Sequence, residues 1–230
     1  MESKFYQADE HRAEKVHELF ATIARRYDLL NDIMSAGLHR RWKQRLVELA
    51  GEPCDVLDLC CGTGDIALRF RGRVVGVDFT EEMLRVAMAR RKSGVSWVRA
   101  DALRLPFGDE SFDVVSVGYG LRNLADIEQG LREILRVLRP GGKFLSLDFG
   151  KPESPAFRAL YFGYLRVVLP ILGRAFCGDP DTHGYILASL QDYPAQRGIK
   201  ELMEACGYGD CGFEEFCLGS MAINYGSKPQ

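Results

Sequence analysis

One stretch of the sequence decides the fold: residues 56–65, which read VLDLCCGTGD. An apolar run typical of a buried strand feeds directly into a turn that holds Gly62 and Gly64. Glycine at these positions removes side chains where the backbone must approach a ligand closely. The stretch therefore predicts a buried strand followed by a ligand-binding turn at the carboxyl end of that strand.

Outward from this turn, short apolar runs alternate with helical patterns. Further strands are predicted at residues 74–78, 95–98, 112–117 and 143–149, and helices at residues 66–70, 81–91 and 127–138. This alternation indicates βαβ units and a parallel sheet. After a helix at residues 196–207, the segments 208–215 and 218–225 are predicted to pair antiparallel at one edge. The predicted fold class is α/β, with a Rossmann-like, mainly parallel seven-stranded sheet and an antiparallel edge.

Two helical segments stand outside this alternation. Residues 1–50 are predicted to form a helical cap, and residues 151–193 a helical insertion on the substrate side. Because no repeat or low-complexity linker sets either segment apart, we interpret all 230 residues as one domain.

Composition narrows the range of functions. The formal net charge of −2 speaks against a nucleic-acid partner, since phosphate binding usually needs a basic face. The chain has seven cysteines, an odd number, and no Cys-x-x-Cys pair, so neither a disulfide framework nor a metal site is expected. Free thiols and an N-terminus without an apolar leader favour a cytoplasmic location.

Residues 157–176 are strongly apolar but include Arg158, Arg166 and Arg174. Three arginines make a membrane-spanning helix too costly. The interpretations left open are a helix packed on the core, an apolar lid over a lipophilic substrate, and a peripheral contact with the inner membrane face. The residues expected to form an apolar wall for a substrate tail are Tyr161, Phe162, Tyr164, Leu165, Val167, Val168, Leu169, Ile171 and Leu172.

The glycine turn alone would suit either a dinucleotide or S-adenosylmethionine. The third glycine of the dinucleotide fingerprint is missing, and Asp65 stands where a pyrophosphate would need neutral or positive surroundings. A sulfonium is positively charged and has no phosphate, so Asp58 and Asp65 are tolerable or favourable near it. These features indicate S-adenosylmethionine as the cofactor and a methyltransferase as the enzyme class.

Acidic residues at successive strand ends support this cofactor. Asp78 ends the second strand and is expected to accept hydrogen bonds from both ribose hydroxyls. Asp101 follows the third strand and is expected to accept from the adenine amino group, with the Ala102 backbone completing the contact. Met83 is predicted to pack against the adenine face. Any one of these acids could equally be a turn or cap residue, but their repetition favours a binding site.

Three stretches resemble a known family. Residues 20–43, FATIARRYDLLNDIMSAGLHRRWK, and residues 120–123, GLRN, resemble two signatures of the quinone-biosynthesis C-methyltransferases, which methylate demethylmenaquinol or the related ubiquinone precursor. Residues 131–142, LREILRVLRPGG, resemble a segment shared more widely among methyltransferases. The resemblance covers residues 16–228. It implies methyl transfer from S-adenosylmethionine to a ring carbon of a lipophilic prenylated quinol.

The resemblance also implies roles for single residues. Cofactor contacts would fall on Thr63, Asp78, Asp101 and Ala102. The chain departs from the family pattern at Gly118, where a small polar residue is frequent, so only backbone can contact the cofactor there. It also departs at Asn224, where the family usually has a histidine, which we interpret as structural.

The expected reaction requires a group that stabilises a phenolate, because a ring carbon attacks the methyl group only after the neighbouring hydroxyl loses its proton. Arg122 and Asn123 follow the fourth strand and are expected to steady the oxyanion and hold the ring hydroxyl, with a capping turn as the alternative. Tyr27 and His39 in the cap are further catalytic candidates. His39 could shuttle a proton, although both residues could equally serve packing.

Two other functions stay open at this point. One is methylation of another small molecule, such as a sterol, a phenol or a phospholipid headgroup, because function resides in the site rather than in the fold. The other is a non-catalytic subunit of a quinone-synthesis complex, against which the intact glycine turn with Asp78 and Asp101 speaks. The sequence also leaves open whether the chain forms a homodimer.

Overall fold

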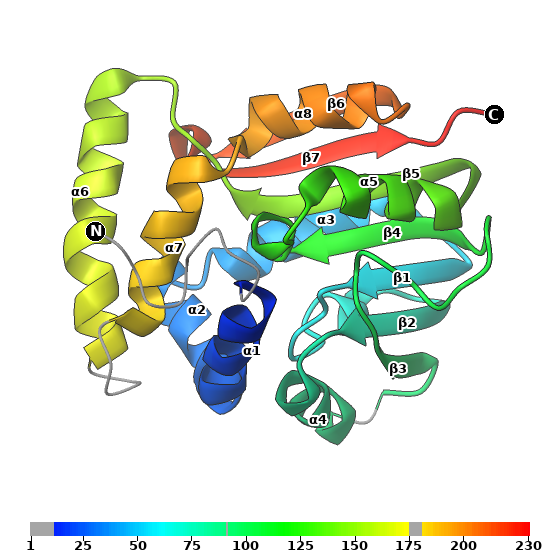
Figure 1. Cartoon of the computed structure of the whole chain (residues 1–230), viewed down its shortest axis with the longest axis horizontal. Helices are drawn as coiled ribbons and strands as arrows, with labels where there is room; N and C mark the ends of the chain where they lie inside the picture. The colour runs from blue at the N-terminus through cyan, green and yellow to red at the C-terminus, as the bar shows by residue number, and fades with distance from the viewer. Residues whose placement is uncertain (1–11, 91, 175–180) are drawn as a thin grey trace.

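The computed structural model describes residues 12–90, 92–174 and 181–230. Within them, one sheet of seven strands runs in the order β3-β2-β1-β4-β5-β7-β6 (Figure 1). The strands are β1 Asp55–Leu59, β2 Arg73–Asp78, β3 Val95–Arg99, β4 Phe112–Gly118, β5 Leu138–Phe149, β6 Gly209–Phe216 and β7 Met221–Ser227. The helices are α1 Arg12–Ile23, α2 Tyr27–Ser35, α3 His39–Ala50, α4 Glu81–Ala89, α5 Ile127–Val137, α6 Pro155–Leu172, α7 Asp181–Asp192 and α8 Ala195–Ala205.

The first five strands are parallel and form the centre of the molecule. β1 pairs with β2 on one side and with β4 on the other, so the strand order reverses at β1. Neighbouring residues of a strand point to opposite faces: Leu57 packs in the cluster that holds Leu131 of α5, whereas Val56 packs with Leu46 of α3. Burial on both faces explains the continuous apolar runs of these strands.

The antiparallel edge is confirmed. β7 pairs antiparallel with β5, and β6 pairs antiparallel with β7 at the outer edge. Together with the parallel strands, this arrangement confirms the predicted α/β fold class, with seven strands among the described residues.

One predicted helix is reduced to a single turn. The segment expected to be helical at residues 66–70 contains only a 3-10 turn, Ala67–Arg69. Phe70 already has an extended backbone, is 2% exposed, and leads into β2 at Arg73. Burial of this aromatic ring so close to the next strand leaves no room for a longer helix.

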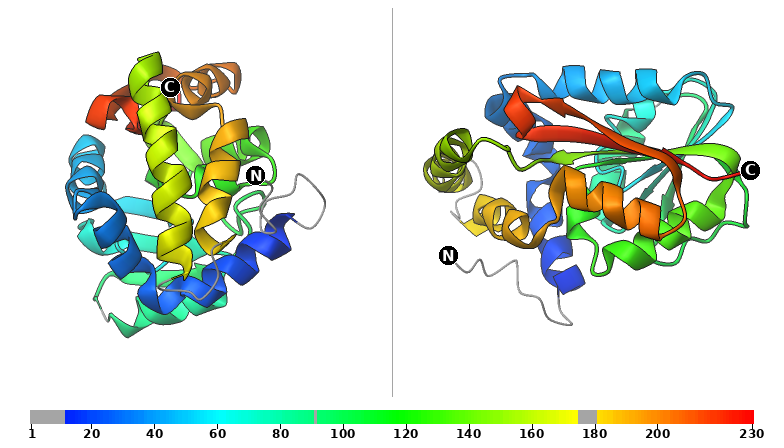
Figure 2. Two further views of the ribbon diagram at one scale, coloured as in Figure 1. Left: turned by 90° about the vertical axis from the view of Figure 1, so that its left-hand side faces the viewer. Right: turned by 90° about the horizontal axis from the view of Figure 1, so that it is seen from above.

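The cap and the insertion lie at the same end of the sheet. In Figure 1, α1, α2, α6 and α7 stand beyond the carboxyl ends of the parallel strands, and the left view of Figure 2 shows α6 and α7 side by side in front of the sheet. The remaining cap helix, α3, covers one sheet face with its buried side chains Trp42 and Leu46. The end of the sheet where a ligand was predicted is therefore the end that these helices surround.

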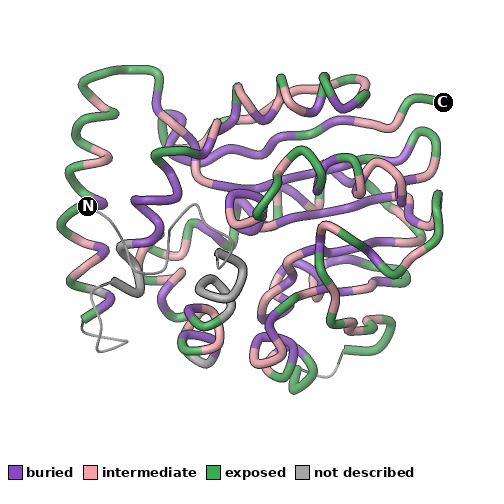
Figure 3. Tube along the Cα trace, in the orientation of Figure 1, coloured by how far each residue is buried: buried purple, intermediate pink, exposed green. Residues whose placement is uncertain are grey.

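Helix α6 buries only one side. Leu165 and Leu169 are 3% and 1% exposed, whereas Leu160, Val167 and Ile171 are 68%, 62% and 61% exposed. Figure 3 shows the same contrast between the largely buried strands and the largely exposed turns of α6. Among the described residues, no helix combines the length and hydropathy that crossing a bilayer would require.

Candidate active site

A cavity of about 190 Å³ opens where β1, β2 and β4 end; we call it the main cavity. This is the switch point of the sheet, where ligands of such folds bind. The predicted cofactor residues that line it are Gly62, Asp78, Met83, Asp101, Ala102 and Gly118.

Two smaller cavities adjoin the main one. The lysine cavity, of about 20 Å³, is lined by Lys43, Asp58, Thr63 and Asp65 among others. The tyrosine cavity, of about 30 Å³, is lined by Tyr27, Tyr119, Arg122, Phe149 and Tyr185 among others. Because Tyr27 and Tyr119 line all three cavities, they stand at the junction.

Asp78 is held in place by backbone donors. Its Oδ2 accepts from the Gly62 N–H at 2.7 Å, and its Oδ1 accepts from the Thr80 N–H at 2.8 Å. A carboxylate has about four acceptor sites. The group is thus oriented at the end of β2 and has the chemistry to accept hydroxyl donors from a ligand.

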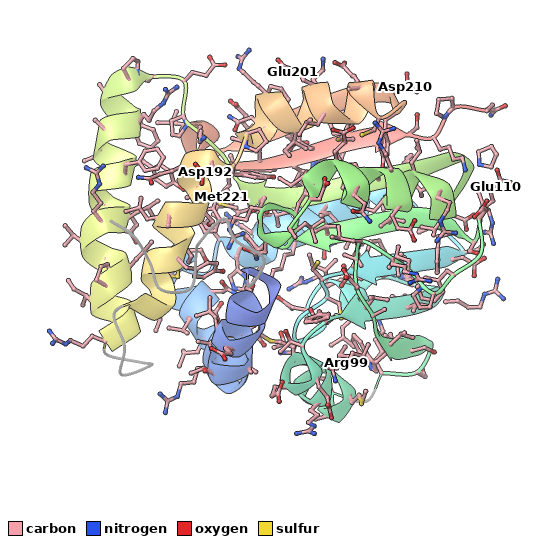
Figure 4. The ribbon with its side chains drawn as sticks, in the orientation of Figure 1. Arg99, Glu110, Asp192, Glu201, Asp210 and Met221 are labelled. Carbon is pink, nitrogen blue, oxygen red and sulfur yellow. The ribbon has the colours of Figure 1, made fainter. Side chains whose placement is uncertain are left out.

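The far side of the main cavity is formed by the segment after β3 and by α4. The Asp101 carboxylate accepts from the Leu103 N–H at 2.9 Å, while Ala102 is 7% and Met83 is 1% exposed. The sequence did not single out Phe79, which is 45% exposed at this cavity. The guanidinium of Arg99, labelled in Figure 4, lies 5.9 Å from the Phe79 ring centroid.

The two glycines of the turn have different tasks. Gly62 has φ +54°, and a Cβ built on it would meet no atom within 4 Å, so it keeps space open at the main cavity. Gly64 has φ +81°, and its Cβ would come within 2.4 Å of the Trp97 ring. Gly64 lines none of the three cavities, so its place in the structure is a packing contact with β3 rather than the predicted contact with a ligand.

Asp58 lies beneath the turn. Its carboxylate is 1% exposed and accepts from the Ser116 hydroxyl at 2.7 Å and from the Ala67 N–H at 2.9 Å. Burial raises the pKa of Asp58 to about 7 despite these two donors. Asp58 therefore ties β1 to β4 and to the turn after the glycine loop, and reaches only the lysine cavity.

The negative charge of Asp65 is compensated by two cations. It accepts from Lys43 Nζ at 2.8 Å and from the Arg69 guanidinium at 3.3 Å. Burial acts to raise the pKa of Asp65, but these cations, Lys43 foremost, lower it overall. The expectation that Asp65 faces a sulfonium is thus replaced by a pairing with the cap helix α3.

Thr63 joins the same loop to the cap. Its hydroxyl, on a residue only 2% exposed, donates to Asp28 Oδ1 at 2.8 Å, and Asp28 also pairs with Arg90 after α4. The loop, the cap and α4 are therefore linked through one carboxylate.

Arg122 is buried in a network of its own. Its guanidinium donates to Asp148 at 2.6 Å, to the Tyr119 carbonyl at 2.8 Å and to the Tyr185 hydroxyl at 3.1 Å. It also lies 4.9 Å from the Phe149 ring centroid. Burial acts to lower the pKa of Arg122, but Asp148 raises it overall. Arg122 lines the tyrosine cavity and not the main one, so it is set back from the predicted methyl donor.

Asn123 and Tyr27 lie closer to the main cavity. The Asn123 side chain lines it and donates from Nδ2 to the Tyr119 carbonyl at 3.2 Å. Burial raises the pKa of Tyr27, so this hydroxyl stays protonated at neutral pH. Both groups can exchange hydrogen bonds with an acceptor near the junction of the cavities.

His39 is placed elsewhere. It is 2% exposed, lines none of the three cavities, and has its Nε2 2.8 Å from Asp32 Oδ1. Burial lowers the pKa of His39 although Asp32 acts to raise it. The geometry favours the packing alternative, in which His39 joins α2 to α3.

The insertion contributes a different helix from the one expected. Tyr185 and Ile186 of α7 line the tyrosine cavity, whereas no described residue of α6 lines any of the three cavities. The expected apolar wall on α6 borders none of these three cavities, because the buried side of α6 packs on the core and its other side faces outward. The side chain of Leu172 and residue 176 lie outside the described residues.

Both departures from the family pattern have a structural account. A Cβ at Gly118 would come within 2.3 Å of Ile66 Cδ1, so a larger residue there requires that side chain to move. Asn224, which is 4% exposed, donates from Nδ2 to the Gln196 carbonyl at 2.8 Å. Asn224 therefore ties β7 to α8, as expected of a structural residue.

Comparison with known proteins decides between the open functions. The model of the ubiE/COQ5 methyltransferase family matches residues 7–228. The chain belongs to this family. It is 39% identical to "Ubiquinone/menaquinone biosynthesis C-methyltransferase UbiE" of Ectopseudomonas mendocina (strain ymp), covering 95% of this chain and 90% of that protein. It is 34% identical to "Demethylmenaquinone methyltransferase" of Desulfitobacterium hafniense (strain Y51), covering 95% and 92%.

Solved structures agree on the fold. A SAM-dependent methyltransferase from Thermotoga maritima superposes with a TM-score of 0.63 at 20% identity, covering 90% of this chain and 98% of that one. Phosphoethanolamine N-methyltransferase 2 of Haemonchus contortus, solved with S-adenosyl-L-methionine, gives a TM-score of 0.59 at 18% identity, covering 83% and 53%. Membership of the ubiE/COQ5 family confirms the expectation of an S-adenosylmethionine-dependent methyltransferase.

Sequence reasoning missed several lining residues of this ubiE/COQ5 member. Tyr119, at the junction of the cavities, has φ +60°, and Cys60, which lines the main cavity, has φ +54°. Cys60 directly follows the first predicted strand and Tyr119 comes two residues after the strand predicted at residues 112–117, which was the available signal. Tyr185 carried no such signal, because it reaches the site through the insertion.

Proposed function

We propose that this protein transfers the methyl group of S-adenosylmethionine to a ring carbon of demethylmenaquinol, giving menaquinol, with the ubiquinone precursor 2-polyprenyl-6-methoxy-1,4-benzoquinol as a second acceptor. The observation that carries the proposal is the junction of the main cavity with the tyrosine cavity at Tyr27 and Tyr119. One cavity has the acids and open backbone that suit the cofactor, and the other has an aromatic lining that suits a quinol ring.

The cofactor residues have separate roles. Asp78 would accept from the ribose hydroxyls, Asp101 would accept from the adenine amino group, and Met83 would pack against the adenine with the Ala102 backbone beside it. Gly62 and Gly118 keep the space open, whereas Asp58, Thr63 and Gly64 hold the loop in shape. The fit is supported by the open space above Gly62 and by the backbone donors that orient Asp78.

When bound, the cofactor would supply an electrophilic methyl group to the ring carbon and leave as S-adenosylhomocysteine, and that carbon would then release its own proton so that the ring regains aromaticity. The protein must stabilise the ring oxygen as its proton leaves. Arg122 acts on that oxygen through Tyr185: the Tyr185 hydroxyl accepts from Arg122, so its own proton is directed to the acceptor. Asn123 and Tyr27 hold the ring hydroxyl, and Asp148 positions Arg122.

The decisive experiment is a transfer assay with the full chain. The purified protein is mixed with methyl-labelled S-adenosylmethionine and with reduced demethylmenaquinone or the reduced ubiquinone precursor, and label in the lipid phase is counted. We expect label with the reduced acceptors and none with the oxidised quinone, whose ring carbon is no longer a nucleophile. Cofactor binding without transfer to either quinol would overturn the proposal in favour of another acceptor, and absence of cofactor binding would favour a non-catalytic subunit.

We also propose that the outer face of α6 contacts an anionic membrane surface, where a prenylated acceptor resides. Leu160, Val167 and Ile171 form an exposed apolar stripe, and residues 155–174 contain three arginines and no acidic residue. Apolar residues flanked by arginine suit the interface of an anionic bilayer.

Vesicle flotation tests this contact. The protein should float with vesicles that contain phosphatidylglycerol, and Val167→Asp should weaken the binding, whereas Met88→Asp, at a residue of α4 that is 49% exposed, should not. Equal binding of both variants contradicts the proposal. A wild-type dimer in light scattering that Val167→Asp dissociates would also contradict it, because α6 would then be a homodimer interface.

A further inference from the structure

Lys43 of α3 is a buried cation that the roles given so far do not use. It is 3% exposed, its Nζ lies 2.8 Å from Asp65 Oδ2, and it stands 5.7 Å from the centroid of the Tyr119 ring. Burying an ammonium costs several kcal/mol unless partners compensate for the lost water. An ammonium has three donors, and the one carboxylate contact leaves capacity for another acceptor.

Asp65 does not depend on Lys43 alone. The Arg69 guanidinium also contacts Asp65, at 3.3 Å. A second cation at this carboxylate means that the Lys43 ammonium can be shared with a second anion without leaving Asp65 uncompensated.

The strand order gives the direction in which the cofactor extends. Asp101 follows β3, Asp78 ends β2, and Gly62 follows β1, and these strands are neighbours in that order. A ligand with its adenine at Asp101 and its ribose at Asp78 therefore continues toward Gly62. Beyond Gly62, which lines both cavities, lies the lysine cavity. The part of the cofactor that follows the ribose is its methionine part, with a carboxylate at its end.

The charges of the site leave one suitable partner for that carboxylate. Among the described residues that line the three cavities, two carry a positive charge, Lys43 and Arg122. Arg122 lines the tyrosine cavity and is bonded to Asp148 and Tyr185. The other charged residues of the main and lysine cavities are acids and would repel a carboxylate.

We propose that the Lys43 ammonium binds the α-carboxylate of the cofactor's methionine part, with Asp65 as the residue that positions it. The proposal rests on the proposed placement of the adenosine between Asp78 and Asp101. Because Lys43 belongs to the cap, the cofactor then bridges the cap and the glycine loop, in parallel with the bond from Thr63 to Asp28.

Calorimetry with two ligands tests this role. S-adenosylmethionine and its decarboxylated form share the adenosine, the sulfonium and the amine, and differ in the carboxylate alone. Wild-type protein should bind S-adenosylmethionine about tenfold to a hundredfold more tightly than the decarboxylated ligand, as expected for a hydrogen bond between charged groups. Lys43→Met should lower the affinity for S-adenosylmethionine by a similar factor and change the affinity for the decarboxylated ligand less than about threefold.

Three comparisons make the result specific. Lys43→Arg keeps the charge and should restore part of the affinity for S-adenosylmethionine. Arg40→Met, one turn earlier on the same helix at a side chain 61% exposed, should leave both affinities unchanged. Thermal unfolding shows whether each variant is folded, and the preference of the wild type for the carboxylated ligand tests the proposal even if Lys43→Met does not fold.

Two results would overturn the assignment. One is equal affinity of the wild type for the two ligands. The other is an equal loss of both affinities in Lys43→Met, which identifies Lys43 as a purely structural ion pair. Absence of any binding of S-adenosylmethionine to the wild type is a different failure, because it contradicts the proposed function itself.

Discussion

At the main cavity, the groups that face the ligand are oriented by backbone hydrogen bonds, whereas at the tyrosine cavity they are oriented by side chains from distant segments. Asp78 is held by two N–H groups that lie 16 and 2 residues away. Arg122 is held by Asp148 and Tyr185, which are 26 and 63 residues away. The backbone donors at Asp78 remain when neighbouring side chains are substituted. The orientation of Arg122 depends on the side chains of both Asp148 and Tyr185.

The largest effect is expected from Arg122→Ala. Removing the guanidinium leaves Asp148, which is 3% exposed, buried without its cation, at a cost of about 3–5 kcal/mol in the free energy of unfolding. Arg132→Ala, which breaks the exposed pair with Glu128, should leave the free energy of unfolding nearly unchanged. Urea unfolding measures both values. A loss below about 1 kcal/mol for Arg122→Ala would show that the acceptor side is no more dependent on side chains than the surface.

A second effect concerns Asp58, the buried carboxylate beneath the glycine loop. Its pKa is raised to about 7 in the folded state, so the folded protein keeps a proton that the unfolded chain releases. The stability that this proton contributes is complete below about pH 4 and is lost as the pH rises through 7. At about 1.36 kcal/mol per pKa unit, the loss is about 4 kcal/mol.

Asp58→Asn removes the titrating group and so separates the stability contributed by its proton from that of the other groups. The variant should lack that part of the decline in stability between pH 4 and pH 7. Urea unfolding at a series of pH values measures the difference. Parallel curves for the wild type and the variant would mean that Asp58 is ionised in the folded protein.

Next in size is the contrast between the two glycines. Gly64→Ala combines a strained positive φ with a contact of 2.4 Å to Trp97, and should cost about 2–3 kcal/mol of stability with little direct effect on the cofactor site. Gly62→Ala carries the strain alone, about 1–2 kcal/mol, but places a methyl group in the main cavity and should weaken cofactor binding. Denaturant unfolding and calorimetry together measure both properties. Weaker cofactor binding in Gly64→Ala together with a larger loss of stability in Gly62→Ala would assign the packing role to Gly62 and the cofactor role to Gly64.

The smallest effect is expected from Tyr185→Phe. Loss of the hydroxyl should lower kcat about tenfold to a hundredfold, which corresponds to about 1.4–2.7 kcal/mol of barrier, and leave cofactor affinity unchanged. Tyr208→Phe is a matched control, because it also deletes a buried hydroxyl, which donates to the Leu131 carbonyl at 2.7 Å far from the cavities. A similar loss of kcat in both variants would point to a general loss of packing.

The same contrast explains how far the sequence could be interpreted. Gly62, Asp78 and Asp101 were predictable because each lies at the carboxyl end of a strand or within three residues of it, and parallel strands bring their carboxyl ends together. The contact of Arg122 with Tyr185 was not predictable, because it depends on how the insertion packs. The single turn at Ala67–Arg69 was missed because the burial of Phe70, and not local propensity, decides it.

The hydrogen bond from Thr63 to Asp28 has a consequence for the catalytic cycle. It fastens the cap to the loop that borders the site, and Tyr27, next to Asp28, lines every cavity. Because the bond closes the cap over the loop, we expect it to break and re-form whenever the methyl donor enters the site or its product leaves.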